Sequence, residues 1–310
     1  MALVSLLAAA AFLAPISEAP TKAQIASAAE YHRAYGGFAL IVLHEGKVIH
    51  QEYAEGRDTD QASQLASGTK SFAGVVAVAA QEDGLLRLDE KVCETITEWK
   101  EDPRKSQITI RQLLSLSSGL VGGPTGSPQS YAASIADETF ADPGEEFQYG
   151  PNPFQVFGEL MRRKLKSEGY LDYLKRRILA PIDCSWGRWT IRRGNEPSVP
   201  SGAFFTVREW VKFGEMLRLE GKVGDKVILK PESVAELFKP MASRAYGLSW
   251  WLGGEAGSKS IPGMVMAAGA GKQRLYVMRE KGLTVARLAP VAGSGRYSDA
   301  EFLTRLTGGE

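Results

Sequence analysis

The chain of 310 residues has an ordinary globular composition, 44% hydrophobic and 24% charged, and is long enough for one large or two modest domains. Its formal net charge is +1 and no run of basic residues occurs, which excludes the electrostatic footprint of a nucleic-acid-binding surface. Cys93 and Cys184 lie far apart without a CxxC partner, so two free buried thiols are favoured over metal ligands. If the protein is exported, a single disulfide between these two cysteines is the alternative.

Residues 1–19 form an apolar leader that ends in small residues. It resembles the hydrophobic region and cleavage zone of a secretory signal, although no lysine or arginine precedes Lys22. The apolar run is short for a membrane span, and no later stretch is long and apolar enough to cross a bilayer. We therefore predict a signal peptide over 1–19 and export to the periplasm or the medium. The alternative is a helix that packs on the domain of a cytoplasmic protein.

The first elements after the leader are a helix, a hairpin and a second helix. Residues 21–36 are expected to form a helix, and residues 38–56 a β-hairpin that turns at Glu45-Gly46. From Ser71 onward the residues FAGVVAVAAQEDGLL are apolar on nearly every side, which predicts a helix that is buried in the middle of the protein and ends at Asp83-Gly84.

Helical spacing dominates the next segment, where helical stretches alternate with Gly/Pro clusters up to about residue 200. Thr206 and Glu209 then stand in capping-box register, which predicts another helix. The last quarter holds two β runs joined near Lys281-Gly282, followed by a closing helix at YSDAEFLTRL.

Strands near both ends of the chain, with helices between them, predict an α+β protein. We expect residues 20–84 and 201–310 to form one sheet domain and residues 85–200 a helical region.

The stretch LASGTKSF, residues 65–72, leads into the buried helix. If that helix begins around Ser67, Lys70 lies close to one turn on and both side chains share a face. A serine needs a base to become a nucleophile, and burial lowers the pKa of a lysine enough for it to serve. The helix N-terminus adds free N–H groups where an oxyanion would develop. The alternative is that Ser67 caps the helix and Lys70 is exposed.

Other catalytic chemistries lack their residues in this chain. The three histidines, His32, His44 and His50, all precede Ser67, and no G-x-S-x-G occurs, which disfavours an α/β-hydrolase triad. HExxH, paired cysteines, metal-spaced Asp/His clusters and phosphate loops of the GxxxxGK[ST] type are absent from the sequence. We therefore expect no metal and no cofactor.

Several stretches follow one another in an order that resembles the serine β-lactamase-related superfamily. That superfamily includes class C β-lactamases, D-alanyl-D-alanine peptidases and family VIII carboxylesterase-like enzymes. The stretches are LASGTKSF, GLLRLDEKV, ITIRQLLSLSSGL, PGEEFQYGPNPFQVFGELM, GAFFTVREWVKFGEML and AYGLSWWL. The resemblance runs from about Ala23 to the C-terminus. It implies a β-lactamase/transpeptidase-like fold, an antiparallel sheet flanked by helices with an inserted all-helical region.

The resemblance also implies a Tyr-x-Asn motif whose tyrosine faces the nucleophile. Tyr149 matches it, with Gly158 at the family's spacing, and a phenol beside a lysine can shuttle a proton. The alternative is a core or rim aromatic. Pro151 stands at the motif's asparagine position and Asn152 follows it. For Asn152 a cap on the helix that starts there is favoured over a contact with the substrate.

The family's third motif reads Lys-Thr-Gly, or His-x-Gly or similar in esterase-like members, and here Ala267-Ala268-Gly269 stand at the corresponding place. The resemblance implies that Gly269 lets the substrate approach this strand. It also implies that the backbone N–H groups of Ala270 and Ser67 form the oxyanion hole. The motif's cation is absent. Lys272 or Arg274 could replace it, but we favour ordinary exposed cations on a strand at both positions.

These residues predict a serine hydrolase that forms an acyl-enzyme, with Ser67 as nucleophile and Lys70 and Tyr149 sharing the proton transfers. A carboxylesterase-like hydrolase of small esters is favoured. The first alternative is a β-lactamase, D-Ala-D-Ala carboxypeptidase or D-aminopeptidase, and an alternative of another class is a non-catalytic protein that binds cell-wall peptides. The expected partner is a small-molecule ester or amide, with no nucleic acid and no stable membrane span; the oligomeric state stays open.

Overall fold

Strands from both ends of the chain meet in one antiparallel sheet in the computed structural model, which describes residues 18–253, 261–292 and 295–308. The strand order is β10-β11-β12-β13-β1-β2. The strands are β1 (Ala39–His44), β2 (Lys47–Tyr53), β10 (Trp251–Leu252), β11 (Met264–Gly269), β12 (Gln273–Met278) and β13 (Leu283–Leu288). β1 pairs with β13, with Ala39 opposite Leu288, so hydrogen bonds join the two ends of the chain. The predicted hairpins at Glu45-Gly46 and Lys281-Gly282 are confirmed.

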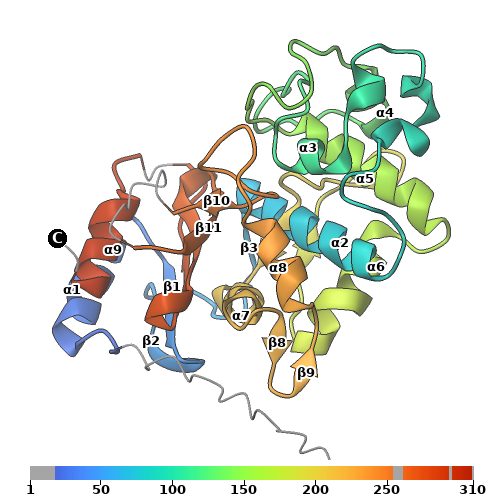
Figure 1. Cartoon of the computed structure of the whole chain (residues 1–310). Coiled ribbons are helices and arrows are strands. Elements are labelled where there is room, and N and C mark those ends of the chain that lie inside the picture. Colours follow the sequence, from blue (N-terminus) through green and yellow to red (C-terminus); the bar gives the residue numbers. More distant parts are fainter. Residues whose placement is uncertain (1–17, 254–260, 293–294, 309–310) are drawn as a thin grey trace, which may run out of the picture.

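Side chains alternate between the two faces of the sheet, and each face has its own layer of helices. Leu40 and Val42 belong to the core beneath α1 (Lys22–Ala34) and α9 (Asp299–Thr307), which lie side by side in Figure 1. The opposite face packs on α7 (Val207–Arg218). The predicted helix starts at Thr21 and Thr206 are confirmed, because each threonine accepts a hydrogen bond from the backbone three residues on.

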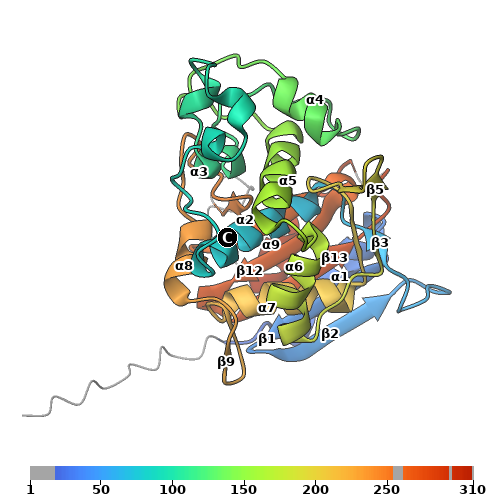
Figure 2. The same cartoon turned by 90° about the vertical axis from the view of Figure 1, so that its right-hand side faces the viewer.

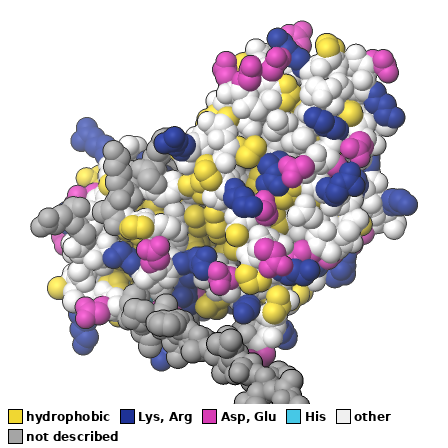
Figure 3. Space-filling view, viewed as in Figure 1, with side chains coloured by type: hydrophobic (Ala, Val, Ile, Leu, Met, Phe, Trp, Pro, Cys, Tyr) yellow, Lys and Arg dark blue, Asp and Glu magenta, His cyan; other side chains and the backbone are white. Residues whose placement is uncertain are grey.

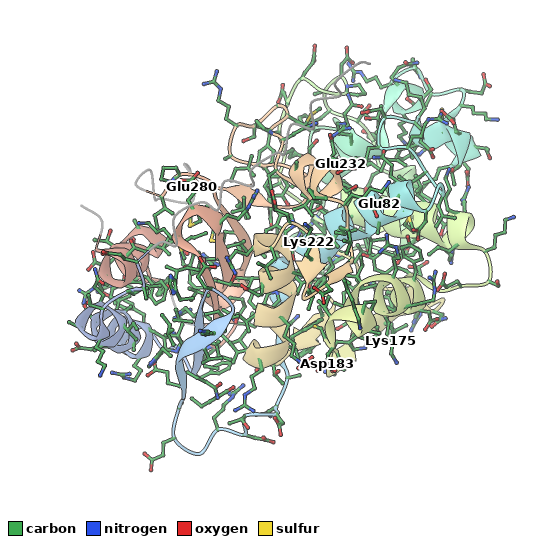
Figure 4. The ribbon with its side chains drawn as sticks, turned by 60° about the horizontal axis from the view of Figure 1, so that its bottom comes forward. Glu82, Lys175, Asp183, Lys222, Glu232 and Glu280 are labelled. Atoms are coloured by element: carbon green, nitrogen blue, oxygen red, sulfur yellow. The ribbon has the colours of Figure 1, made fainter. Side chains whose placement is uncertain are left out.

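The helix α2 (Lys70–Glu82) lies between the sheet and the helical region, as Figure 2 shows. All its residues from Lys70 to Ala80 are buried, which confirms the predicted central helix. Its C-terminal end is anchored: Arg177 donates to Glu82 at 2.8 Å and to Asp83 at 3.0 Å. Glu82, labelled in Figure 4, also accepts a bond from the backbone of Lys230.

The remaining elements are short apart from α5. The helices are α3 (Ile110–Leu114), α4 (Tyr131–Ala136), α5 (Asn152–Leu165), α6 (Tyr170–Leu174) and α8 (Pro231–Leu237). The 3-10 helical turns are η1 (Ala66–Thr69), η2 (Val92–Glu94), η3 (Thr97–Trp99), η4 (Lys105–Gln107), η6 (Ala180–Ile182), η7 (Ala270–Lys272) and η8 (Arg279–Lys281). A π-helical turn, η5 (Lys175–Leu179), follows α6. The short strands are β3 (Ser63–Gln64), β4 (Arg188–Trp189), β5 (Ile191–Arg192), β6 (Glu196–Pro197), β7 (Ala203–Phe205), β8 (Lys222–Val223) and β9 (Lys226–Val227).

The segment 85–200 is therefore not all helical. It contributes β4 to a small sheet of order β3-β7-β4, and β5 and β6 pair with each other. These strands are only two residues long, too short for an alternating pattern to reveal them in the sequence. The sheet β3-β7-β4 matters for function because β3 ends directly before the turn that carries Ser67.

The described surface and helices bear on the expected charge distribution and on the question of a membrane span. Acidic and basic side chains are interspersed over the face drawn in Figure 3, in keeping with the net charge of +1. None of the helices in the described ranges is long and apolar enough to cross a membrane.

Both cysteines are free thiols, but only Cys184 is buried, whereas Cys93 is partly exposed. The predicted leader, except for Glu18 and Ala19, lies outside the described residues.

Candidate active site

Ser67 lies in the turn η1, which joins β3 to α2. Ala66 before it has a left-handed backbone (φ 48°), a conformation that costs a non-glycine residue about 1–2 kcal/mol. Thr69 stabilises this turn, since its hydroxyl donates to Ala66 O at 2.7 Å and accepts from the Ala203 N–H of β7 at 3.2 Å. The helix α2 has no side-chain cap, so the alternative role of Ser67 as a helix cap is wrong.

Lys70 faces Ser67 across this turn. Its Nζ donates to Ser67 Oγ at 3.2 Å and to Pro200 O at 3.3 Å, and the residue is only 3% exposed. The alternative of an exposed first-turn lysine is therefore wrong. Burial lowers the pKa of Lys70 to about 7. Among the described residues no carboxylate forms an ion pair with Lys70 to oppose this shift.

Tyr149 reaches the same serine from the loop before α5. Its phenol lies near enough to Ser67 for that side chain to act on its pKa, and Lys70 Nζ lies 4.9 Å from the centre of its ring. Burial raises the pKa of the Tyr149 phenol, so it stays protonated at neutral pH. The structure thus brings together the three side chains for which the sequence predicted a shared catalytic role.

Gly269, the last residue of β11, contacts the turn of Ser67 directly. A Cβ atom at Gly269 would overlap the carbonyl oxygen of Leu65 and lie 3.0 Å from the Gly68 nitrogen. The close approach that this glycine allows is therefore between the strand and the nucleophile turn itself. Ala270 follows as the first residue of η7, which contacts η1. Its backbone N–H thus belongs to the segment that lies against Ser67.

Asn152 does not belong to this cluster. Its side chain has no exposed surface, and its Nδ2 donates to Val121 O at 3.3 Å and to Asp137. A contact with substrate would require an exposed atom, so the structure does not place Asn152 in a substrate site. The predicted capping role is also wrong, because Asn152 is the first helical residue and Pro151 occupies the cap position without a side-chain bond.

Two features of the site were missed or misjudged from the sequence. Trp251 stacks on Tyr149 with ring centres 5.5 Å apart, and Tyr246 packs against both rings. Two of these aromatics stand in AYGLSWWL, so that stretch could have pointed to them. Arg274 is not the exposed cation that we favoured: it is 6% exposed and paired with Asp299. Arg274 and Asp299 lie 25 positions apart in the chain, so no local sequence pattern points to the pair.

A model of the Beta-lactamase family matches residues 21–307, nearly the whole chain. The chain belongs to the Beta-lactamase family. This membership confirms the resemblance inferred from the ordered motifs, and the antiparallel sheet with its helices is the fold of that family.

The curated relatives and solved structures described here are distant from this chain in sequence. Protein flp of Staphylococcus aureus (strain NCTC 8325 / PS 47) is 26% identical over 166 residues, which are 47% of this chain and 33% of flp. The chain thus matches about a third of the length of these curated relatives.

Two solved structures show the shared fold. A penicillin-binding protein homologue from Caulobacter crescentus superposes with a TM-score of 0.75 at 13% identity, over 94% of this chain and 97% of that one. EstCE1, a hydrolase with promiscuous acyltransferase activity, superposes with a TM-score of 0.73 at 17% identity, over 91% of this chain and 98% of that one.

Proposed function

We propose that this protein, a serine hydrolase of the Beta-lactamase family, forms an acyl-enzyme on Ser67 and hydrolyses small carboxylic esters. The observation that carries the proposal is the 3.2 Å contact between Lys70 Nζ and Ser67 Oγ at a buried site. With a pKa of about 7, Lys70 is neutral in a large fraction of the molecules at neutral pH. A neutral amine beside the hydroxyl can accept its proton.

In the proposed acylation, Ser67 Oγ attacks the carbonyl carbon while its proton passes to Lys70. The charge that develops on the carbonyl oxygen is stabilised by the backbone N–H groups of Ser67 and Ala270. Tyr149 relays the proton from Lys70 to the leaving alkoxide, so the ester C–O bond breaks and the alcohol departs. In the second half, water gives a proton to the same pair and attacks the acyl carbon. The bond between that carbon and Ser67 Oγ then breaks, the proton returns to Ser67 as a hydroxyl, and the carboxylic acid departs.

The preference for esters rests on the charges around β11. Peptides ending in D-alanine and β-lactams carry a carboxylate, which the Lys-Thr-Gly lysine of related enzymes would pair. Here alanine replaces that lysine, and the buried guanidinium of Arg274 is already neutralised by Asp299. A neutral ester needs no such cation. β-Lactams and D-amino-acid amides are therefore the second substrate class.

Covalent labelling is the direct test of the proposed nucleophile. We expect a fluorophosphonate probe to add to Ser67, with the mass increase confined to the peptide that contains it, because the hydroxyl lies beside a neutral amine. Ser67→Ala should take up no probe, whereas the exposed Ser167→Ala should label like the wild type.

A panel of short-chain nitrophenyl esters, a chromogenic cephalosporin and a D-Ala-D-Ala peptide then ranks the substrates. We expect the esters to have the highest kcat/KM. Faster turnover of the cephalosporin or the peptide would favour the second substrate class. If the wild-type protein takes up no fluorophosphonate and hydrolyses none of these substrates, the alternative of a non-catalytic protein that binds cell-wall peptides is favoured.

The pH dependence of ester hydrolysis should follow Lys70. Because catalysis needs the neutral amine and the Lys70 pKa is about 7, kcat/KM is expected to rise by about tenfold between pH 6 and pH 8. The pKa of Tyr149 is raised above 10.0, so no loss should follow until the pH exceeds 10. Initial rates at substrate concentrations below KM give the profile. An acid limb near pH 4 to 5 would instead identify a carboxylate as the base.

A further inference from the structure

Arg274 lies buried next to the end of the strand that contacts Ser67. It stands on β12 opposite Ala268 of β11, and its Nη1 donates to Gly269 O at 3.1 Å. The same nitrogen donates to Gln273 O at 2.9 Å. Since the residue is only 6% exposed, its guanidinium acts on the protein backbone rather than on solvent.

The bond to Gly269 O has a direct consequence for the neighbouring N–H. The carbonyl of Gly269 and the N–H of Ala270 belong to one peptide unit, which is planar and trans, so the two groups point in opposite directions. A donor that fixes the oxygen therefore fixes the direction of the N–H. In the proposed function this N–H is one of the two donors that stabilise the oxyanion.

The guanidinium is itself held in place by the C-terminal helix. Asp299, in the first turn of α9, accepts from Arg274 Nε at 2.6 Å and from Nη2 at 3.1 Å. Tyr276 donates to the same carboxylate at 2.5 Å, and its hydroxyl lies 3.1 Å from that of Tyr297. With one edge of the fork bound to the carboxylate, the remaining Nη1 protons are directed at the backbone carbonyls.

A second buried arginine holds the other end of the same turn. Arg287 donates from Nη1 to Lys272 O at 2.7 Å and from Nη2 to Tyr35 O at 2.9 Å. The side chain of Gln273 bonds to both backbone groups of Ala289, at 2.5 and 3.0 Å. The segment from Gly269 to Gln273 is therefore fixed through its carbonyls and its flanking strand. Among the side chains of the described residues, it is Arg274 that donates to the peptide unit containing the Ala270 N–H.

We propose that Arg274 is a positioning residue for hydrolysis: by bonding Gly269 O, and held in turn by Asp299, it directs the N–H of Ala270 into the oxyanion hole. The inference rests on the proposed function. Through Asp299, the C-terminal helix α9 thereby contributes to the geometry of the active site. Arg274 does not touch the substrate in this arrangement.

The test is Arg274→Gln measured with a small neutral ester and with an alkyl boronic acid, which forms a tetrahedral adduct on a serine. We expect kcat to fall by about 10- to 100-fold, because removing one oxyanion donor outright costs about 10²- to 10³-fold. KM for the ester should change by less than threefold. The inhibition constant of the boronic acid should rise in parallel with the loss in kcat/KM. The acid limb of the pH profile should stay at its wild-type position, since Lys70 is untouched.

The control is Arg279→Gln. Arg279 lies just after the same strand β12 and pairs with Glu220 at the surface, so this variant should keep wild-type kinetics. Asp299→Asn, which keeps the shape of the side chain, should lower kcat by a smaller factor than Arg274→Gln. KM for the ester should again change little, and the inhibition constant of the boronic acid should again rise. This variant also supplies the measurement if Arg274→Gln does not fold.

The outcomes separate the two proposals. If wild type hydrolyses the ester and both variants keep kcat and boronic acid affinity within twofold, the positioning role is overturned and the proposed function stands. A loss that moves the acid limb, or that leaves boronic acid affinity unchanged, would also overturn it. If wild type neither hydrolyses esters nor takes up fluorophosphonate, it is the proposed function that fails.

Discussion

Replacing Lys70 with methionine is expected to abolish most ester hydrolysis while making the fold more stable. The variant lacks the only amine that contacts Ser67 Oγ among the described residues, so kcat/KM should fall by about a thousandfold. Methionine fills a similar volume, so the packing around the site should persist. Initial rates and covalent labelling of Ser67 measure the loss, and both should fall together.

The gain in stability follows from the pKa of Lys70, which is about 7 in the fold against 10.5 for an ordinary lysine. Below pH 7 both the folded and the unfolded chain carry the proton, and burial of the charge destabilises the fold in full. Between pH 7 and 10.5 Lys70 is neutral in the folded protein but still protonated in the unfolded chain. The free energy of unfolding of the wild type therefore rises with pH, by roughly 2–5 kcal/mol over this pH range. The advantage of Lys70→Met should therefore be largest at or below neutral pH and shrink toward pH 10.5.

Thermal melting at several pH values checks this expectation. Lys105→Met is a matched control, because Lys105 is also buried but bonds to Ile135 O, away from Ser67. It should leave activity within twofold of wild type. A Lys70→Met protein that retains a tenth or more of the activity would show that another group is the base.

Replacing Gly269 with alanine is expected to lower kcat by about 10²- to 10³-fold, as for the loss of an oxyanion donor. The added Cβ would overlap Leu65 O and crowd the Gly68 nitrogen. Both atoms belong to the backbone and cannot rotate away, so the strand and the turn must separate. The N–H of Ala270 then moves away from Ser67, while Lys70 keeps its contact within the turn.

The measurement is kcat and KM for a nitrophenyl ester, together with the midpoint of urea unfolding. Gly295→Ala serves as the control, since a Cβ at Gly295 meets nothing within 4 Å. That variant should match wild type. If Gly269→Ala kept its activity within threefold, close contact between β11 and the nucleophile turn would not be needed for hydrolysis.

Local signals explain what could be predicted from the sequence. Thr21 and Thr206 mark helix starts because a cap is made by a side chain and a backbone N–H three residues apart. Ser67 and Lys70 share a face for a similar reason, as they lie within one turn. The hairpin at Glu45-Gly46 follows from turn residues between two β-rich runs. In each case the interacting groups are close in the chain.

The same local reasoning failed where a distant segment decides the outcome. Asn152 has the residue type of a helix cap, but loops around Val121 and Asp137 bind its side chain and draw it into the interior. Arg274 follows a strand pattern that is equally compatible with an exposed cation. Asp299, on the C-terminal helix, buries and pairs it instead.

By itself, the sequence determined the nucleophile turn, the central buried helix and, through ordered motifs, the family. The tertiary structure alone decided that Pro200, 130 residues away, bonds the amine of Lys70 and that Gly269 packs on Leu65. The physical reason is that periodicity and capping record interactions within a few residues. The pKa of a lysine and the direction of an oxyanion donor depend instead on which remote segments exclude water and bond the backbone around them.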